Sequence, residues 1–136
     1  MGGTRIKAGL VVDGQVISAS TLNVQSDLLQ DHLNELERTI YSLSAKAEGS
    51  LGGIGIAFPS IVDSEEMKIL SRYVKYTDAH DLDLSGWITD RFEVPLVIEN
   101  DARAAFIGEW LFGAGRYLSG RVLLTLGTGV GTAVLL

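Results

Sequence analysis

Two acidic side chains and an amide stand where an apolar segment gives way to a helical pattern. The apolar run 96–98 ends at Glu99, Asn100 and Asp101, and alanine-rich helical sequence follows at once. Asn is a favoured helix N-cap, and Asp in the first turn complements the helix dipole. In open α/β sheets, ligands bind beyond the carboxyl ends of strands, where a carboxylate can accept a proton from a substrate hydroxyl. The pair therefore suits a structural cap, a catalytic site, or both.

Glycine-rich turns that contain threonine occur near both ends of the chain, in Gly2, Gly3 and Thr4 and again in Gly127, Thr128 and Gly129. Glycine lets backbone N–H groups approach an anion closely, and a threonine hydroxyl adds a donor, so such turns can cradle a polyphosphate. Hairpins also use glycine for purely structural reasons. Pro59 and Ser60 follow another apolar segment and either line the same cleft or form a plain turn.

The elements that must position these residues follow from turn signals and hydrophobic period. Two strands joined by Asp13-Gly14 open the chain, because Asp-Gly favours a two-residue hairpin turn. A helix follows whose apolar residues recur every three or four positions, with Ser26 as its N-cap and Gly49 as its stop. A buried strand at 51–58 comes next, followed by an irregular polar segment over 60–82.

The second half is predicted to alternate in the same way. A modest helix at 83–94 begins near Asp83 or Ser85, and a buried strand at 96–99 leads into the helix at 101–112. That last helix is apolar almost all round, so we expect it to be heavily buried. Two apolar strands then flank the second glycine turn. Buried strands separated by helices predict an α/β fold, a mixed sheet with an antiparallel flank and covering helices.

Composition narrows the function classes. The 136-residue chain carries a net charge of −6 with no basic block, which argues against a nucleic-acid or anionic-membrane partner through this segment. It has no cysteine, and His32 and His80 stand alone, so we expect no metal ligands here. No apolar stretch reaches the length of a membrane span and no secretory leader is visible. The expected location is the cytoplasm.

Five segments, in this order and spacing, resemble the ROK family of bacterial sugar kinases and repressors: GGTRIKAGLV, GIGIAFPS, IENDARAA, GEWLFGAG and LTLGTGVG. The resemblance covers essentially the whole chain. It implies a lobe of the ribonuclease H-like (actin/hexokinase ATPase) fold. It also implies that Asp101 is the catalytic base and that Asn100 and Ser60 contact the sugar. Phosphate binding would fall to the two glycine turns, Gly2, Gly3 and Thr4 with Gly127, Thr128 and Gly129.

The chain also departs from the family pattern. The family's first motif normally carries an aspartate and follows an apolar strand, whereas here Met1 directly precedes Gly2. We therefore expect a lobe truncated at both ends, with residues 1–117 in the N-terminal sugar-kinase lobe and 118–136 beginning the second ATPase lobe. The absent strand would be central to the sheet, so an unpaired groove is expected. Ser60 also stands where the family more often has glycine.

The resemblance predicts ATP-dependent phosphorylation of a hexose or N-acetylhexosamine by the parent protein, a glucokinase-like enzyme. ATP and Mg²⁺ would be its cofactors, with zinc confined to the second lobe, and its partners would be a sugar, ATP and further copies of itself. The isolated chain is expected to be inactive. The alternatives are the sugar-sensing domain of a ROK repressor, another ATPase of the superfamily, or a structural fragment without activity.

Overall fold

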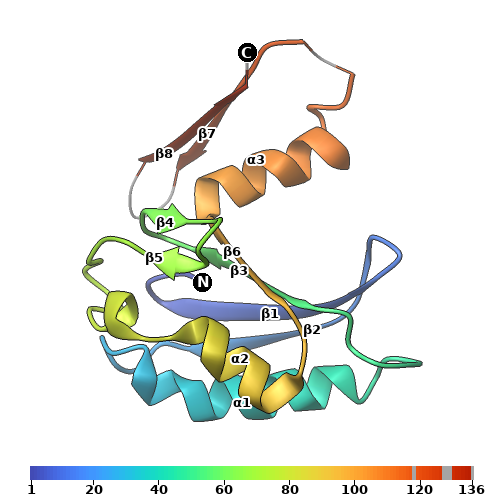
Figure 1. Ribbon diagram of the computed structural model, residues 1–136. Helices are drawn as coiled ribbons and strands as arrows, with labels where there is room; N and C mark the ends of the chain where they lie inside the picture. The colour runs from blue at the N-terminus through green and yellow to red at the C-terminus, as the bar shows by residue number, and fades with distance from the viewer. Residues whose placement is uncertain (118, 127–129, 136) are drawn as a thin grey trace.

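The computed structural model describes residues 1–117, 119–126 and 130–135. Its elements follow the predicted order (Figure 1): β1 (Arg5–Val12), β2 (Gln15–Asn23), α1 (Gln30–Ser44), β3 (Ile54–Phe58), β4 (Val62–Asp63), β5 (Lys68–Ile69), a 3-10 turn (Ala79–Asp81), α2 (Leu84–Phe92), β6 (Leu96–Asn100), α3 (Asp101–Leu111), β7 (Arg121–Leu126) and β8 (Val130–Leu135). The α/β alternation predicted from hydrophobic period is present.

The first hairpin has the turn that its sequence predicts. β1 pairs antiparallel with β2, and the register shifts between Leu10 and Val11. Asp13 and Gly14 both take positive φ angles, 51° and 76°, as a tight two-residue turn between right-twisted strands requires. This hairpin sets β1 so that Ile6 faces the core.

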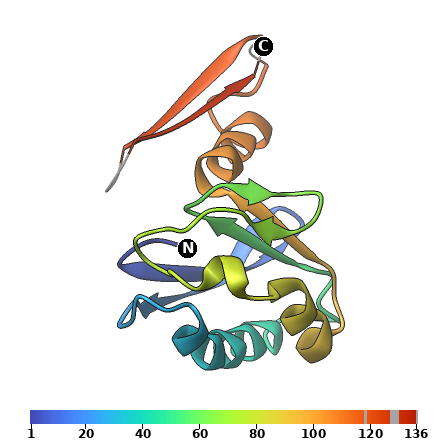
Figure 2. The same cartoon turned by 60° about the vertical axis from the view of Figure 1, so that its left-hand side comes forward.

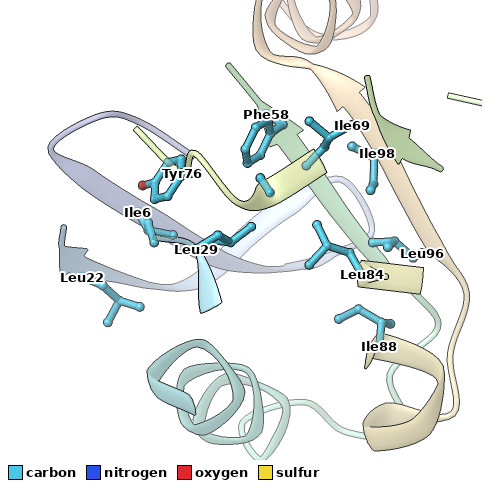
Figure 3. Close-up of a cluster of buried hydrophobic side chains, with 11 residues drawn as sticks. Ile6, Leu22, Leu29, Phe58, Ile69, Tyr76, Leu84, Ile88, Leu96 and Ile98 are labelled. Carbon is cyan, nitrogen blue, oxygen red and sulfur yellow. The ribbon is translucent and has the colours of Figure 1, made fainter. Parts of the chain in front are cut away.

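The core lies between the strands and two helices on one side of them. β3 and β6 run parallel, so that Phe58 and Asn100 are partners at the same end of the pair. Both α1 and α2 lie on one side of these strands, whereas α3 and the β7–β8 hairpin lie on the other (Figures 1 and 2). Figure 3 shows the side chains that fill the space between, of which Phe58, Ile88 and Ile98 are completely buried.

Helix α1 does not begin where the local sequence predicts. The prediction of Ser26 as N-cap is wrong, since α1 starts at Gln30 after Leu29 and its first residues receive no local side-chain cap. The carboxylate of Asp78 instead accepts hydrogen bonds from the backbone N–H groups of Leu29 and Gln30, at 2.5 and 3.0 Å. The helix also ends at Ser44, five residues before Gly49. A residue distant in sequence therefore fixes the start of α1.

An open groove separates the two strand pairs. Among the described residues, β1 pairs only with β2 and β3 only with β6, so one edge of each strand is unpaired. A cavity of about 320 Å³ lies between these edges and above the helices, lined by Ile6, Leu10, Ile40, Ile56 and Ile88 among others. The groove predicted from the sequence is present, and it separates the parallel pair from the antiparallel pair.

Helix α3 is less buried than its composition predicts. Only Ala102 and Phe106 are buried in it, while Trp110 is 40% exposed and Phe112, its C-cap, is 71% exposed. The expectation of heavy burial is therefore wrong. α3 contacts β3 and β6 as well as β7 and β8, yet most of its residues are exposed. The division of the chain at residue 118 stays a prediction.

Candidate active site

A cavity of about 560 Å³ opens where the carboxyl ends of β3 and β6 meet three other segments. Its walls are the start of the chain, the Pro59–Ser60 turn, the segment 71–73, the start of α3, and the ends of β7 and β8. This is the position that the parallel pair favours for a ligand, since both strands point their carboxyl ends at it. Gly2, Gly3, Ser60, Asn100 and Asp101 all line the cavity.

Asn100 caps α3 and still contributes to the cavity. Its Oδ1 accepts hydrogen bonds from the N–H groups of Ala102 and Arg103, at 3.0 and 3.2 Å. Its Nδ2 donates to the Ser60 carbonyl at 3.1 Å, which leaves one amide hydrogen for a ligand. The cap that the sequence predicts is confirmed, and the remaining donor is compatible with the predicted contact to a sugar hydroxyl.

Asp101 is the first residue of α3 and its side chain is exposed at the cavity. Its Oδ1 accepts a hydrogen bond from the N–H of Ala102 at 2.8 Å. No described residue donates to Oδ2, which can therefore accept a proton from a hydroxyl. The Met1 ammonium lies nearby and donates to the Ala57 carbonyl. Burial lowers the pKa of this ammonium, and the negative charge of Asp101 partly opposes that shift.

Ser60 joins two walls of the cavity. Its hydroxyl donates to the Ser71 carbonyl at 2.8 Å and lies 2.7 Å from the Ser71 hydroxyl. Its carbonyl accepts the hydrogen bond from Asn100. The hydroxyl is thus already engaged within the protein, and Ser60 holds Asn100 as well as the segment that carries Ser71. Direct contact of Ser60 with a substrate stays a prediction.

The predicted phosphate residues divide into three groups. Gly2 and Gly3 line the cavity, and the Gly2 carbonyl accepts a 2.8 Å hydrogen bond from the buried Tyr76 hydroxyl. Thr4 is exposed and is not part of the cavity wall. Residues Gly127, Thr128 and Gly129 lie outside the described residues, although their neighbours Leu126 and Val130 line the cavity.

The sequence did not predict the segment 71–73 as part of the site. Ser71, Arg72 and Tyr73 follow the short strand β5 and line the cavity, together with Thr125 of β7. The available signal was a polar triplet at the end of a strand, inside a stretch that otherwise looks irregular. Only the folded chain brings it beside Ser60.

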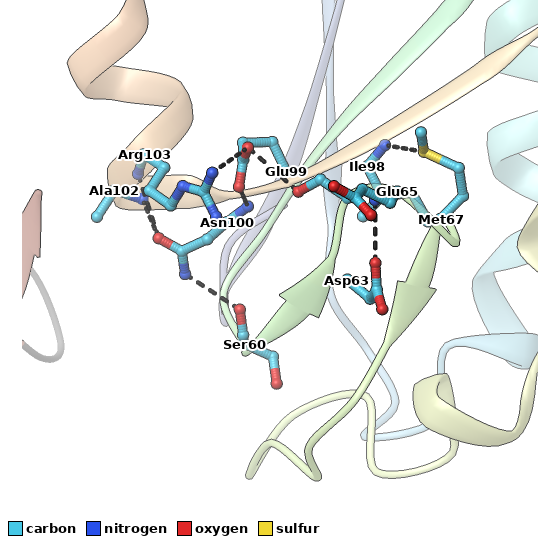
Figure 4. A network of polar contacts seen from close by, with 10 residues as sticks. Ser60, Asp63, Glu65, Met67, Ile98, Glu99, Asn100, Ala102 and Arg103 are labelled. Carbon is cyan, nitrogen blue, oxygen red and sulfur yellow. Dashed lines mark hydrogen bonds and ion pairs between the residues drawn. The ribbon is translucent and has the colours of Figure 1, made fainter.

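Glu99 organises the junction between β6 and α3 (Figure 4). Its Oε1 accepts the Asn100 N–H at 2.7 Å, and its Oε2 lies 3.2 Å from the Ser64 hydroxyl and 3.4 Å from Arg103. The side chain is only 16% exposed. Glu99 therefore holds the backbone at Asn100 and ties it to the β4–β5 turn and to α3. Of the two acidic residues in Glu99-Asn100-Asp101, Glu99 therefore has a structural role, holding the residues that line the cavity.

A family model described as the ROK family matches residues 1–136. The chain belongs to the ROK family. It is 34% identical over 136 residues to a glucokinase of Thermotoga maritima, covering 98% of this chain and 42% of the relative. It is also 28% identical over 116 residues to a xylose repressor of Bacillus subtilis, covering 85% of this chain and 27% of that protein. The resemblance drawn from the sequence motifs is confirmed.

The fold of this ROK chain matches solved structures of the family. A ROK family glucokinase from Streptomyces griseus, solved in complex with glucose and AMPPNP, superposes with a TM-score of 0.83 at 28% identity. The match covers 99% of this chain and 42% of that one. The predicted actin/hexokinase-like ATPase fold is therefore confirmed. The chain spans less than half the length of these relatives.

No three acidic or histidine side chains among the described residues are grouped so as to hold a metal ion. None of the helices described is long and apolar enough to cross a membrane.

Proposed function

We propose that the whole protein carrying this chain transfers a phosphoryl group from ATP to a hydroxyl of a hexose or N-acetylhexosamine. The observation that supports this most is the cavity position of Asp101, whose Oδ2 accepts no hydrogen bond from a described residue. Its neighbour Asn100 retains one amide donor. The similarity to the Thermotoga glucokinase, and to a glucokinase that holds glucose and AMPPNP, supports the same reaction.

In this proposal Asp101 accepts the proton of the attacking sugar hydroxyl, while Asn100 orients the sugar ring. Phosphoryl transfer depends on positioning and charge stabilisation more than on covalent chemistry, so one carboxylate base and backbone donors suffice from this lobe. Gly2 and Gly3 provide backbone close to the cavity, and Thr4 with Gly127, Thr128 and Gly129 completes the proposed phosphate-binding set. The remaining nucleotide contacts would come from elsewhere in the protein.

Mg²⁺ would reach this site bound to the nucleotide. Among the described residues of the cavity wall, Asp101 is the only acid, which is too few for an all-protein site. Mg²⁺ commonly keeps several waters and binds through one or two carboxylates plus substrate phosphates, and that pattern fits a single carboxylate. The ion would neutralise charge on the phosphates of ATP. We place zinc, where present, outside this chain.

Three related expectations belong to the same proposal. We expect the whole protein to act in the cytoplasm, where ATP and sugar metabolites are available. We expect the protein to assemble as a homo-oligomer. We expect the 136 residues by themselves to show no ATP-dependent kinase activity, because the cavity offers few of the contacts that a nucleotide needs.

The test is ADP release by the whole protein across a panel of hexoses and N-acetylhexosamines, beside its Asp101→Asn variant. We expect one sugar to stimulate release and the variant to lose about 100-fold to 10,000-fold of kcat. Asp90→Asn on α2 is the matched control, because Asp90 is equally acidic and exposed but is not part of the cavity wall. Full activity in Asp101→Asn would rule out Asp101 as the base.

A second candidate function is sugar sensing without catalysis. The 28% identity to the Bacillus subtilis xylose repressor favours it, since a repressor keeps the sugar site but need not transfer phosphate. Saturable sugar binding by calorimetry, with no ADP release for any sugar, would establish this alternative.

A further inference from the structure

One cationic residue of the cavity wall, Arg72, is not used by the proposed reaction. Among the described residues lining the cavity, Arg72 is the only lysine or arginine, and Asp101 is the only acid. The ion pairs formed by the described residues do not include Arg72. No carboxylate of the described residues therefore occupies the Arg72 guanidinium.

The backbone beside Arg72 is held firmly in place. The Ser71 hydroxyl lies 2.7 Å from the Ser60 hydroxyl and accepts the N–H of Ile61 at 3.3 Å. The Leu70 N–H also donates to the Ile61 carbonyl at 2.8 Å. A continuous series of hydrogen bonds therefore runs from the 71–73 segment through Ser60 and Asn100 to the start of α3. Arg72 and Asp101 stand at the two ends of this series.

One hydrogen bond orients the Arg72 guanidinium and leaves most of its N–H groups available for a ligand. Arg72 Nε donates to His80 Nε2 at 3.3 Å, which uses one of the five N–H groups. The two terminal nitrogens remain, and an arginine fork suits the paired oxygens of a carboxylate or phosphate. A neutral hexose offers no such group. The site thus combines an acceptor for a hydroxyl proton at one end with a receptor for an anion at the other.

We propose that Arg72 binds an oxyanion, a carboxylate or phosphate group, of the ligand that fills this cavity. The identity of that ligand as a sugar or a nucleotide rests on the proposed function. The oxyanion has two sources with the same chemistry. It is either an acidic substituent of the sugar, which would make a hexuronate a better ligand than the neutral hexose, or a phosphate of the nucleotide.

The experiment measures ligand binding to the 136-residue chain by calorimetry or by NMR shift titration. The probes are glucuronate against glucose, galacturonate against galactose, and tripolyphosphate against inorganic sulfate. They are applied to the native chain and to Arg72→Gln, Arg72→Lys and Arg38→Gln. Arg38 is an exposed arginine on α1 outside this cavity, so its variant controls for the change in net charge. Thermal unfolding of each variant checks that the fold is kept.

An oxyanion on Arg72 predicts about a tenfold or greater loss of affinity for the anionic probe in Arg72→Gln, since a charge-assisted hydrogen bond is broken. Arg72→Lys should retain part of the affinity, and neutral sugars and the Arg38 variant should be unchanged. Loss confined to the sugar acids assigns the substituent of the sugar, and loss confined to tripolyphosphate assigns the nucleotide.

Equal affinities of the native chain and Arg72→Gln for every anionic probe would overturn the inference and leave Arg72 a solvated surface residue. That outcome is separable from failure of the proposed function. ADP release by the whole protein that depends on Asp101 but not on Arg72 would keep the kinase and reject the anion site. Anion binding that depends on Arg72, without any ADP release by the whole protein, would keep the anion site and reject the kinase.

Discussion

The strand and helix core and the C-terminal region use the same apolar residue types in opposite ways. Phe58, Ile88 and Ile98 in the core are completely buried. In the C-terminal region, Phe112 at the C-cap of α3 is 71% exposed and Leu126 of the hairpin is 82% exposed. Both regions contribute to the cavity, yet only the first is packed on several sides.

This difference shows that apolar content does not determine burial. β7 alternates between partly buried and exposed residues, and its inner side contacts α3 while its outer side has no cover among the described residues. The core strands instead receive α1 and α2 on one side. The outer side of the hairpin is therefore an exposed apolar patch, of the kind that commonly marks an interaction surface.

The largest expected effect is on core packing. Replacing Phe58 by Ala should lower the free energy of unfolding by about 3 to 5 kcal/mol, because the side chain is 0% exposed and leaves a cavity. The matched variant Phe112→Ala removes the same ring from an exposed site and should cost less than about 1 kcal/mol. Urea denaturation of both variants measures the contrast. Equal losses would show that the two regions are packed alike.

The next expected effect is a pH dependence of stability from the buried Tyr76 hydroxyl, which bonds the Gly2 carbonyl at the cavity. Burial, with a smaller contribution from Tyr73, raises the pKa of Tyr76 from 10.0 to about 12. Because the folded pKa is the higher one, the protonated phenol stabilises the fold fully below pH 10, and this contribution is lost as the pH rises toward 12. The shift corresponds to about 2 to 3 kcal/mol.

Tyr76→Phe removes this titration together with the hydrogen bond to Gly2. The stability advantage of the native chain over the variant, followed by urea denaturation between pH 8 and 12, should therefore shrink as the pH rises. A difference that stays constant across this range would mean that the Tyr76 hydroxyl titrates normally in the folded chain.

A smaller effect concerns the distant cap of α1. Asp78→Ala should lower the free energy of unfolding by about 1 kcal/mol, because the N–H groups of Leu29 and Gln30 lose their acceptor. Ser26→Ala, the substitution that the local sequence would single out, should have little effect, since the Ser26 hydroxyl accepts the Leu28 N–H and donates to the exposed Asp31 carboxylate, and caps no N–H group of α1. If Ser26→Ala lowered the free energy of unfolding more than Asp78→Ala, Ser26 would be the residue that caps α1 after all.

The helix caps show which features of the fold the sequence alone can predict. Asn100 caps α3 as predicted, and Asp83, one of the two predicted starts of α2, caps that helix by accepting the Gly86 N–H at 2.9 Å. Both caps depend on residues only two or three positions apart. The Asp13-Gly14 turn is equally local and was also correct. The family motifs likewise predicted that Ser60, Asn100 and Asp101 would share one site, and all three line one cavity.

The failures all depend on contacts between distant segments. Asp78 lies 49 residues after Leu29, so no short pattern could identify it as the cap. Arg72 lines the cavity beside Ser71, which bonds Ser60, 11 residues earlier. The burial of α3 depends on what packs against it, and composition does not contain that information. Hydrophobic period predicts that a face exists but not how completely it is covered.

The smallest expected change in stability has the most visible consequence for association. Leu124→Ser on the outer side of β7, where the residue is 62% exposed, should change the free energy of unfolding by no more than about 0.5 kcal/mol. It should nevertheless reduce self-association of the chain in sedimentation velocity, because it interrupts the exposed apolar row formed with Val122 and Leu126. Leu123→Ser, on the side that faces α3, is the control and should cost more stability. If Leu124→Ser proves the more destabilising of the two, the outer side of the hairpin is packed, and the contrast between the two regions is wrong.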